Sequence, residues 1–299
     1  MHACLLTLLL LISLLTNTNC FKWQNVLKKA ILPIVLLSPS SIVLADDLIT
    51  NPNTVIISKT ADNLIDSNNV DTMKDNIDVY FGAGCFWHIS HEFYDAEKRI
   101  LGRNDDTITS RTGYAGGSRY GKVNKNSGNP GQKFANGERQ VCYHNLMGVS
   151  DYGDLGHGEV VELKIPSSSF DGFVDTYFSL FVNGNRPDVG DKGPEYRSLV
   201  GIPGGYSNTN LMSKLEKVAK EKGFTLVEGK GDDQDTLGKK MIWIMDTEKF
   251  PFNQAELYHQ FHDGFMINEF YPQSYNDVAK SAYKRGLIQY TGCPDSIPN

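Results

Sequence analysis

Three cysteines are the first residues in this chain of 299 whose number and type point to chemistry. Of its five cysteines, Cys85, Cys142 and Cys293 lie outside the first 45 residues. Three thiols cannot all pair within one chain, so at least one of them is free or bonded only transiently. An exported protein that keeps an unpaired thiol invites a chemical explanation.

Cys85 is the best candidate for a reactive thiol. It follows a predicted strand and a Gly-Ala-Gly turn, at the predicted start of a helix. Free backbone N–H groups and the positive end of the helix dipole stabilise a thiolate there. We therefore expect the pKa of this thiol to fall from about 8.5 toward 7. The alternative is a small buried hydrophobe, since free cysteines are among the most buried residues.

Hydrophobic periodicity predicts the elements that must position Cys85. Residues 77–81 alternate and are rich in β-formers, which predicts a strand, and apolar residues at 86, 89, 93, 96 and 100 predict the helix that follows. Further strands are expected over 107–114, 160–165, 198–202, 224–227 and 241–245, and further helices over 170–181, with Ser169 as its cap, and 211–223. The glycine-rich and asparagine-rich residues 117–158 are expected to be irregular. Interleaved strands and helices predict one α/β or α+β domain.

Five motifs occur in order along the chain: FGAGCFW at 81–87, TGYAGG at 112–117, GHGEVV at 156–161, GDKGPEYRS at 190–198 and AELYHQF at 255–261. Together they resemble the A-type peptide methionine sulfoxide reductases, a family that reduces the S-epimer of methionine sulfoxide. The resemblance covers residues 76–262. It implies an α+β fold, in a single compact domain with a mixed β-sheet, flanking helices and long coil segments. It also implies a protein-repair enzyme, acting under oxidative stress on methionine sulfoxide in proteins and on the free amino acid.

The resemblance assigns the chemistry residue by residue. Cys85 is the nucleophile, and Phe86 and Trp87 form the pocket for the methyl group of the sulfoxide. Glu159 is the general acid. The cysteine becomes a sulfenic acid as methionine is released. Because valines follow Glu159 directly, we expect burial to raise its pKa into the working range of an acid.

Two further motifs supply supporting residues by the same resemblance. Asp191 and Tyr196 help to hold the sulfoxide oxygen or a water molecule. Tyr258 and His259, in the last motif, are expected to stabilise the fold behind the active site and not to carry a chemical step.

A second thiol must condense with the sulfenic acid, and an external dithiol must then restore the enzyme. Cys293 is the predicted resolving cysteine, since it lies in a C-terminal tail expected to be mobile and the family often keeps resolving cysteines there. Cys142 is the rival, or else an inert buried thiol. The resemblance implies no cofactor, with a thioredoxin-like dithiol as reductant.

The sequence departs from the family pattern at several places. Glu138 occupies the position of a family tyrosine, which is then absent or supplied by Tyr143, and His88 replaces a glycine. Coil insertions are expected around 118–137 and 143–155. These departures motivate a second hypothesis, a degenerate family member that binds oxidised peptides without turnover. A third hypothesis is another thiol chemistry, such as peroxide reduction.

Composition and motifs exclude several other classes. Hydrophobic residues make up 40% of the chain and charged residues 21%, which is not the composition of a disordered chain, and a net charge of −6 without a basic run gives no nucleic-acid footprint. No phosphate-binding or dinucleotide fingerprint occurs. A metal site on His88, His91 and Glu92 is less plausible than a solvated helix face. The pair His157 and Glu159 lacks the paired cysteines of a zinc deaminase, so no metal is expected.

The first 45 residues are expected to be a targeting leader. Residues 4–15 form an apolar run followed by small polar residues, and 21–45 repeat the pattern with a lysine pair and a shorter apolar core. Two signals in series resemble the bipartite leaders of algae with secondary plastids. The alternative is one signal followed by an uncleaved amphipathic or anchoring stretch. Residues 46–75 are an expected polar linker, and 76–299 the reductase-like domain with its mobile C-terminal tail.

The leader implies export to the plastid, extending to the thylakoid lumen, or alternatively secretion or residence in an endomembrane lumen. The expected partners are proteins or peptides containing methionine sulfoxide and the thioredoxin-like reductant. We expect no nucleic-acid partner, no stable membrane association after processing, and a monomer.

Overall fold

The computed structural model describes residues 75–122, 133–145, 148–263 and 271–295. The predicted leader and the predicted linker up to residue 74 lie outside these residues, as do parts of both expected coil insertions. Among the described residues, no helix is both long enough and apolar enough to cross a bilayer.

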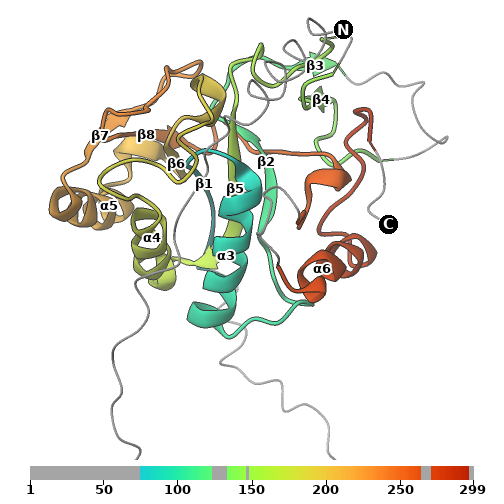
Figure 1. The fold of residues 1–299 in the computed structure, drawn as a ribbon, viewed down its shortest axis with the longest axis horizontal. Coiled ribbons are helices and arrows are strands. Elements are labelled where there is room, and N and C mark those ends of the chain that lie inside the picture. The colour runs from blue at the N-terminus through green and yellow to red at the C-terminus, as the bar shows by residue number, and fades with distance from the viewer. Residues whose placement is uncertain (1–74, 123–132, 146–147, 264–270, 296–299) are drawn as a thin grey trace, which may run out of the picture. The chain divides into compact units, whose positions relative to one another are not determined.

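Seven strands form one mixed sheet in the order β7-β8-β6-β1-β5-β2-β9 (Figure 1). The strands are β1 (Asn76–Gly82), β2 (Arg111–Ala115), β5 (Gly158–Pro166), β6 (Leu199–Ile202), β7 (Thr225–Glu228), β8 (Met241–Asp246) and β9 (Asn253–Gln254). The central strand β1 runs antiparallel to both neighbours, whereas β6, β7 and β8 are mutually parallel. Strands β3 (Gly121–Lys122) and β4 (Arg139–Gln140) pair separately.

Four α-helices occur in the described part of the chain: α3 (Phe86–Leu101), α4 (Phe170–Ser179), α5 (Thr209–Lys222) and α6 (Gln273–Lys284). Short 3-10 turns cover Ser167–Ser169, Pro194–Tyr196, Gly205–Ser207 and Leu257–His259. Helix α3 lies over the central strands, with α4 and α5 on one side of it and α6 on the other (Figure 1). The α+β class and the mixed sheet are as predicted.

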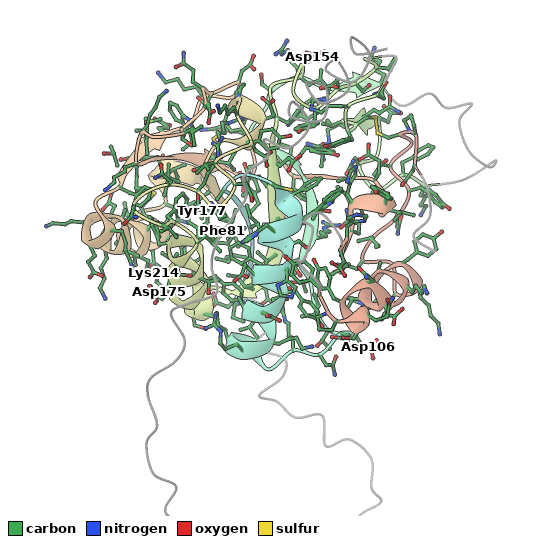
Figure 2. All side chains as sticks on the ribbon, in the orientation of Figure 1. Phe81, Asp106, Asp154, Asp175, Tyr177 and Lys214 are labelled. Atoms are coloured by element: carbon green, nitrogen blue, oxygen red, sulfur yellow. A yellow bond between two sulfur atoms is a disulfide. The ribbon has the colours of Figure 1, made fainter. Side chains whose placement is uncertain are left out.

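The main core lies between the sheet and helices α3, α4 and α5. Phe81 of β1 and Tyr177 of α4 face one another there, with ring centroids 5.4 Å apart (Figure 2). The stripe of aromatic residues predicted to be core on α4 is buried accordingly. A smaller cluster on the opposite face of the sheet contains Tyr80, Leu199 and Met245. The sheet is therefore covered on both faces along its centre.

Most element boundaries lie within two residues of the prediction, and the start of β2 differs most. The strand expected over 107–114 begins only at Arg111, because the buried carboxylate of Glu97 accepts the backbone N–H groups of Thr109 and Ser110. Those N–H groups are therefore not available for hydrogen bonds to a neighbouring strand. Helix α4 ends at Ser179, and Ser169 makes no side-chain cap hydrogen bond. Helix α6 and strand β9 were not predicted.

Candidate active site

Cys85 is the N-cap residue of α3 and has a free, buried thiol, with 6% of the residue exposed. Strand β1 passes into α3 through the turn that contains Gly82 and Gly84. A Cβ atom on Gly82 would lie only 2.5 Å from the carbonyl oxygen of Glu159, so β1 and β5 approach closely just before the thiol. This approach brings the start of α3 to the side chain of Glu159.

Both oxygens of the Glu159 carboxyl are held. Oε2 accepts the backbone N–H of Phe86 at 2.9 Å, and Oε1 accepts the hydroxyl of Tyr152 at 3.0 Å. Burial raises the pKa of Glu159 to about 8, against these two hydrogen bonds and with the help of nearby Asp191 and Asp188. At neutral pH this carboxyl therefore carries a proton, as the sequence led us to expect.

The pKa of the Cys85 thiol is shifted in the direction opposite to the expected one. Burial raises its pKa well above the ordinary value, and the charge of Glu159 raises it further. A hydrogen bond from the Trp87 backbone N–H lowers the pKa, but desolvation outweighs it. The prediction of a lowered pKa was therefore wrong. The free N–H groups at the start of α3 do not all serve the sulfur of Cys85, since the Phe86 N–H donates to the carboxyl of Glu159.

The two aromatic residues after Cys85 have unequal exposure. Phe86 is 1% exposed and packs on Tyr114 and His259, at 5.9 and 5.3 Å between ring centroids. Trp87 is half-buried and lies 4.1 Å from the ring of His262 and 6.1 Å from that of Tyr258. Trp87 therefore presents the accessible apolar surface, and Phe86 supports it from beneath.

The last motif divides its residues between two environments. His259 is buried between Phe86, Trp87 and Tyr143, and burial lowers its pKa to about 3, so it is neutral. This fits the supporting role predicted for it. Tyr258, in contrast, is 41% exposed and borders a pocket instead of lying behind the site.

Three tyrosines surround Glu159. Tyr152 bonds the carboxyl directly, Tyr196 hydrogen bonds to Tyr152, and Tyr143 stacks on Tyr152 with ring centroids 5.8 Å apart. Burial raises the pKa of each, so all three hydroxyls stay protonated near neutral pH.

Tyr152 was not predicted from the sequence to be a residue of the site. It lies in the segment 143–155 that we predicted to be an insertion, where spacing relative to a motif gives no guidance. A hydroxyl on Glu159 is thus present although Glu138 stands where the resemblance led us to expect a tyrosine. The signal available was the aromatic residue itself, a few positions before Glu159.

Asp191 is half-buried beside this group. Burial raises its pKa, opposed by Arg186 and assisted by Glu195. Its charge acts on Cys85 and on Glu159, which places it within electrostatic range of both. The structure thus gathers Cys85, Glu159, Tyr196 and Asp191 around one centre.

Arg197 holds three of the motifs together. Its buried guanidinium donates to the carbonyl oxygens of Pro194, Gly116 and Gly156, at 2.7, 3.0 and 2.9 Å. His157 adds a second tie, because its ring bonds the Gly117 N–H and the Arg119 carbonyl. His157 is therefore a structural residue here.

Cys142 and Cys293 form a disulfide that joins positions 151 residues apart. Of the three cysteines beyond residue 45, Cys85 alone is left free, which agrees with the cysteine count. Neither of the two candidate resolving cysteines is a free thiol in this state.

The C-terminal tail is held by the disulfide and by two hydrogen bonds. In addition to the disulfide, Gln140 donates to the carbonyl of Gly292 at 2.7 Å, and the Asp295 carboxylate accepts the Leu257 N–H at 2.7 Å. Its mobility was predicted from sequence position alone, whereas these contacts restrain it. Residues 296–299 lie outside the described part of the chain.

Glu256 lies beside the disulfide. Its carboxylate and the two sulfur atoms lie within 4.8 Å of one another, the one three-donor cluster of this kind in the part of the chain that is described. Because the sulfur atoms are bonded to each other, they do not offer two thiolates to a metal ion. His88, His91 and Glu92 do not bring three ligand atoms together: His91 Nδ1 lies 3.9 Å from a Glu92 oxygen, and its ring stacks on Tyr271 with 3.7 Å between centroids.

Comparisons with known proteins found structural similarity only. No protein-family model matches the chain, and no curated protein matches its sequence. The chain is similar to methionine sulfoxide reductase A of Corynebacterium diphtheriae, with 17% identity over 66% of this chain and 84% of that one, at a TM-score of 0.35. It is also similar to reduced Mxr1 of Saccharomyces cerevisiae, with 20% identity over 66% of this chain and 92% of that one, at a TM-score of 0.36. The same yeast protein in an unusual oxidized form has 17% identity to this chain, over 67% of this chain and 90% of that one, at a TM-score of 0.32. These scores are low, so we base the function on the residues of the site.

Proposed function

We propose that the protein reduces methionine S-sulfoxide, with Cys85 as the nucleophile and Glu159 as the general acid. The observation that supports this most is the shared N-terminus of α3. A free thiol caps the helix, and a buried carboxyl with a pKa of about 8 binds its first N–H group. A proton donor active at neutral pH thus adjoins a sulfur nucleophile.

The first step transfers an oxygen atom between two sulfur atoms. The sulfur of Cys85 attacks the sulfoxide sulfur while Glu159 gives its proton to the oxygen. The oxygen moves to Cys85, which becomes a sulfenic acid, and the substrate leaves as a sulfide. The proton of the thiol returns to Glu159, so the carboxyl begins and ends the step protonated. A positioned acid contributes about 10²–10⁴ in rate.

Burial makes Glu159 necessary as acceptor as well as donor. Because the pKa of Cys85 is raised, its sulfur becomes a good nucleophile only when its proton has a place to go, and Glu159 can accept that proton once it has given its own to the sulfoxide oxygen. When Glu159 is protonated, its negative charge no longer opposes the thiolate, and the Trp87 N–H remains to stabilise it. Acid and nucleophile therefore assist one another.

The surrounding residues suit a small methyl sulfoxide. Trp87, supported by Phe86, offers an apolar surface to the methyl group. Tyr196, through its hydrogen bond to Tyr152, and Tyr143 are protonated hydroxyls within electrostatic range of Glu159, and we assign them as donors to the sulfoxide oxygen. Asp191 influences the protonation of the pair through its charge.

The second half of the cycle uses Cys142 and Cys293 together. One of these thiols attacks the sulfenic sulfur of Cys85 and releases water, and the other then displaces Cys85. This sequence ends with Cys85 free and the other two joined, which is the bonding pattern described above. A thioredoxin-like dithiol reduces that disulfide and completes the turnover.

The two competing hypotheses are each weakened by one observation. The hydroxyl of Tyr152 on Glu159 supplies the tyrosine whose absence suggested a degenerate binding protein. Peroxide reduction has no counterpart to the apolar surface of Trp87 and Phe86 beside Cys85, which suits a methyl sulfoxide. Export to a plastid and repair of oxidised proteins there remain proposals that rest on residues 1–45.

The test is the burst of sulfide release without reductant, on protein reduced beforehand and freed of reductant. Wild type is expected to release two equivalents of sulfide from an S-sulfoxide substrate, because Cys85 is free again once Cys142 and Cys293 have joined, and none from the R-epimer. Cys85→Ser is expected to release none, and Glu159→Gln to slow release about 10²–10⁴-fold. The matched control is Glu216→Gln on the exposed face of α5. Undiminished release by Glu159→Gln would contradict the proposal.

A further inference from the structure

A second buried carboxyl lies next to a sulfur pair on the far side of Tyr143. The carboxyl of Glu256 is 3% exposed and lies within 4.8 Å of both sulfur atoms of the Cys142–Cys293 disulfide. Its Oε1 accepts the Tyr143 N–H and its Oε2 accepts the Tyr114 hydroxyl, each at 2.8 Å. Its position is thus held from two directions.

A pocket leads from solvent to this carboxyl. It has a volume of about 320 Å³, and Glu256 forms part of its lining. Tyr143, which follows Cys142, and Pro294, which follows Cys293, lie on its wall. The remaining lining residues are His144, Asn145, Tyr258, His259 and Asp295. The residue after each half-cystine thus lines the pocket, and the carboxyl that both sulfur atoms adjoin lines it as well, so an external thiol entering here reaches the neighbourhood of the disulfide.

The two half-cystines differ in surroundings. Cys142 is 1% exposed and follows the fully buried Val141, whereas Cys293 is a half-buried residue between half-buried Gly292 and exposed Pro294. Cys293 is therefore the half-cystine with the more exposed chain around it, and we take its sulfur as the one attacked and that of Cys142 as the one that leaves. A thiolate released at such a buried place is costly unless it is neutralised.

We propose that Glu256 is the general acid for reduction of the Cys142–Cys293 disulfide by an external dithiol. Its physiological use as the recycling step rests on the proposed function above, but the step itself does not. By the reverse path, the carboxylate acts as the base when the disulfide forms.

A thiolate of the dithiol attacks Cys293, forming a mixed disulfide and breaking the bond to Cys142. Glu256 gives its proton to the departing sulfur of Cys142. The second thiol of the reductant then attacks the mixed disulfide, which oxidises the reductant to a disulfide and releases Cys293. Glu256 regains a proton from water in the pocket.

The electrostatic surroundings of Glu256 suit this role. The titratable groups that face it are Tyr114 from β2, Tyr143 and His144 from the segment after β4, Tyr258 and His259 from the turn Leu257–His259, and Asp295 from the tail. His259 is neutral, so it does not hold the carboxyl ionised. Burial raises the pKa of Glu256 to about 7, opposed by the hydrogen bonds from Tyr143 and Tyr114 and assisted by Asp295. The acid form is therefore available at neutral pH.

The test uses a Cys85→Ser background, which has no sulfoxide chemistry, so its outcome is independent of the proposed function. The oxidised protein is mixed with dithiothreitol, and the appearance of thiols at Cys142 and Cys293 is followed by alkylation and mass spectrometry. At pH 6.5 the added Glu256→Gln change is expected to slow the reaction about 10²-fold, because the leaving sulfur lacks its donor. Glu216→Gln, on α5, is the control and is expected to match the parent.

The pH dependence separates an acid from a structural residue. At each pH the rate of the parent is divided by that of Glu256→Gln, which cancels the titration of dithiothreitol. Since only protonated Glu256 donates, this ratio is expected to be large below pH 7 and to fall toward 1 above it. A ratio near 1 at all pH values, or a large ratio that does not change with pH, overturns the proposal.

Tyr114→Phe keeps the test decisive if Glu256→Gln does not fold. This change removes a hydrogen bond that lowers the pKa of Glu256 and leaves the carboxyl in place. The variant is expected to match the parent below pH 7 and to be reduced several-fold faster above it. A constant ratio between the two proteins from pH 6 to 9 contradicts the assignment.

Discussion

Glu159 and Glu256 are built in the same way at two different sulfur sites. Each is a buried carboxyl that accepts one backbone N–H and one tyrosine hydroxyl: Phe86 and Tyr152 for the first, Tyr143 and Tyr114 for the second. Their tyrosines stack on one another, with ring centroids 4.6 Å apart. In both cases desolvation outweighs the hydrogen bonds, so each carboxyl holds its proton near neutral pH.

The protonation of Glu159 gives the first prediction. Because its pKa is raised to about 8, the acid form persists through neutral pH and is lost as pH rises further. The first-turnover rate constant is expected to be constant from pH 6 to 7.5 and to fall about tenfold per unit well above pH 8. Quenched single-turnover experiments measure this directly.

The control for this profile is Glu216→Gln, which should show the same fall. In Glu159→Gln the slow residual rate should lack it. A wild-type rate constant that rises steadily through pH 9 would indicate that thiolate formation at Cys85, and not proton donation, limits the step.

At the scale of elements, the site depends on how closely β1 passes β5. Gly82 ends β1, and a Cβ atom there would also lie 3.2 and 3.3 Å from the side chains of Val160 and Leu199. The absence of a side chain at this position thus lets the N-terminus of α3 reach Glu159. Arg197 supports the same arrangement from the other side, through three loop carbonyls.

Gly82→Ala is therefore expected to damage both stability and chemistry. Overpacking at the junction should cost about 1–3 kcal/mol of the free energy of unfolding, and displacement of Cys85 from Glu159 should slow the first turnover. Urea denaturation and single-turnover assays measure the two effects. Gly190→Ala is the matched control, because a Cβ atom there has no neighbour within 4 Å. Equal behaviour of the two variants would show that the close approach is unimportant.

At the scale of the whole molecule, the disulfide closes the chain on itself. It fastens the tail that follows α6 to the irregular segment before β5, across 151 residues of sequence. Hydrogen bonds from Gln140 and to Asp295 fasten the same tail independently. Reduction during a catalytic cycle thus removes a covalent link while other contacts remain.

Loss of this link should lower stability without abolishing the fold. Cys293→Ser is expected to lower the free energy of unfolding by about 2–5 kcal/mol, the range typical of a disulfide that closes a long loop. The denaturation midpoint of wild type in dithiothreitol should move to that of the variant, whereas Cys85→Ser should retain the disulfide contribution. An unchanged midpoint for Cys293→Ser would mean that the tail contributes its stability without the bond.

The main elements follow from local patterns. The alternation over 77–81 and the helical spacing after Cys85 predict β1 and α3, because each pattern reflects burial of one face of a local element. Helix α6, with a similar stripe around Tyr275 and Val278, carries the same kind of signal but was not recognised. The late start of β2 was not predictable, since Glu97 reaches its N–H groups from another element.

Residue types and motif order determine which groups are candidates for chemistry, because identity and local spacing are properties of the chain. Tertiary structure decides what these groups are. Burial by distant segments sets the pKa of Cys85 opposite to what its helix position suggests. The meeting of segments far apart in sequence pairs Cys142 with Cys293, places Tyr152 on Glu159, and brings Glu256 to the sulfur atoms. Desolvation and proximity depend on the assembled neighbourhood, and no local pattern encodes them.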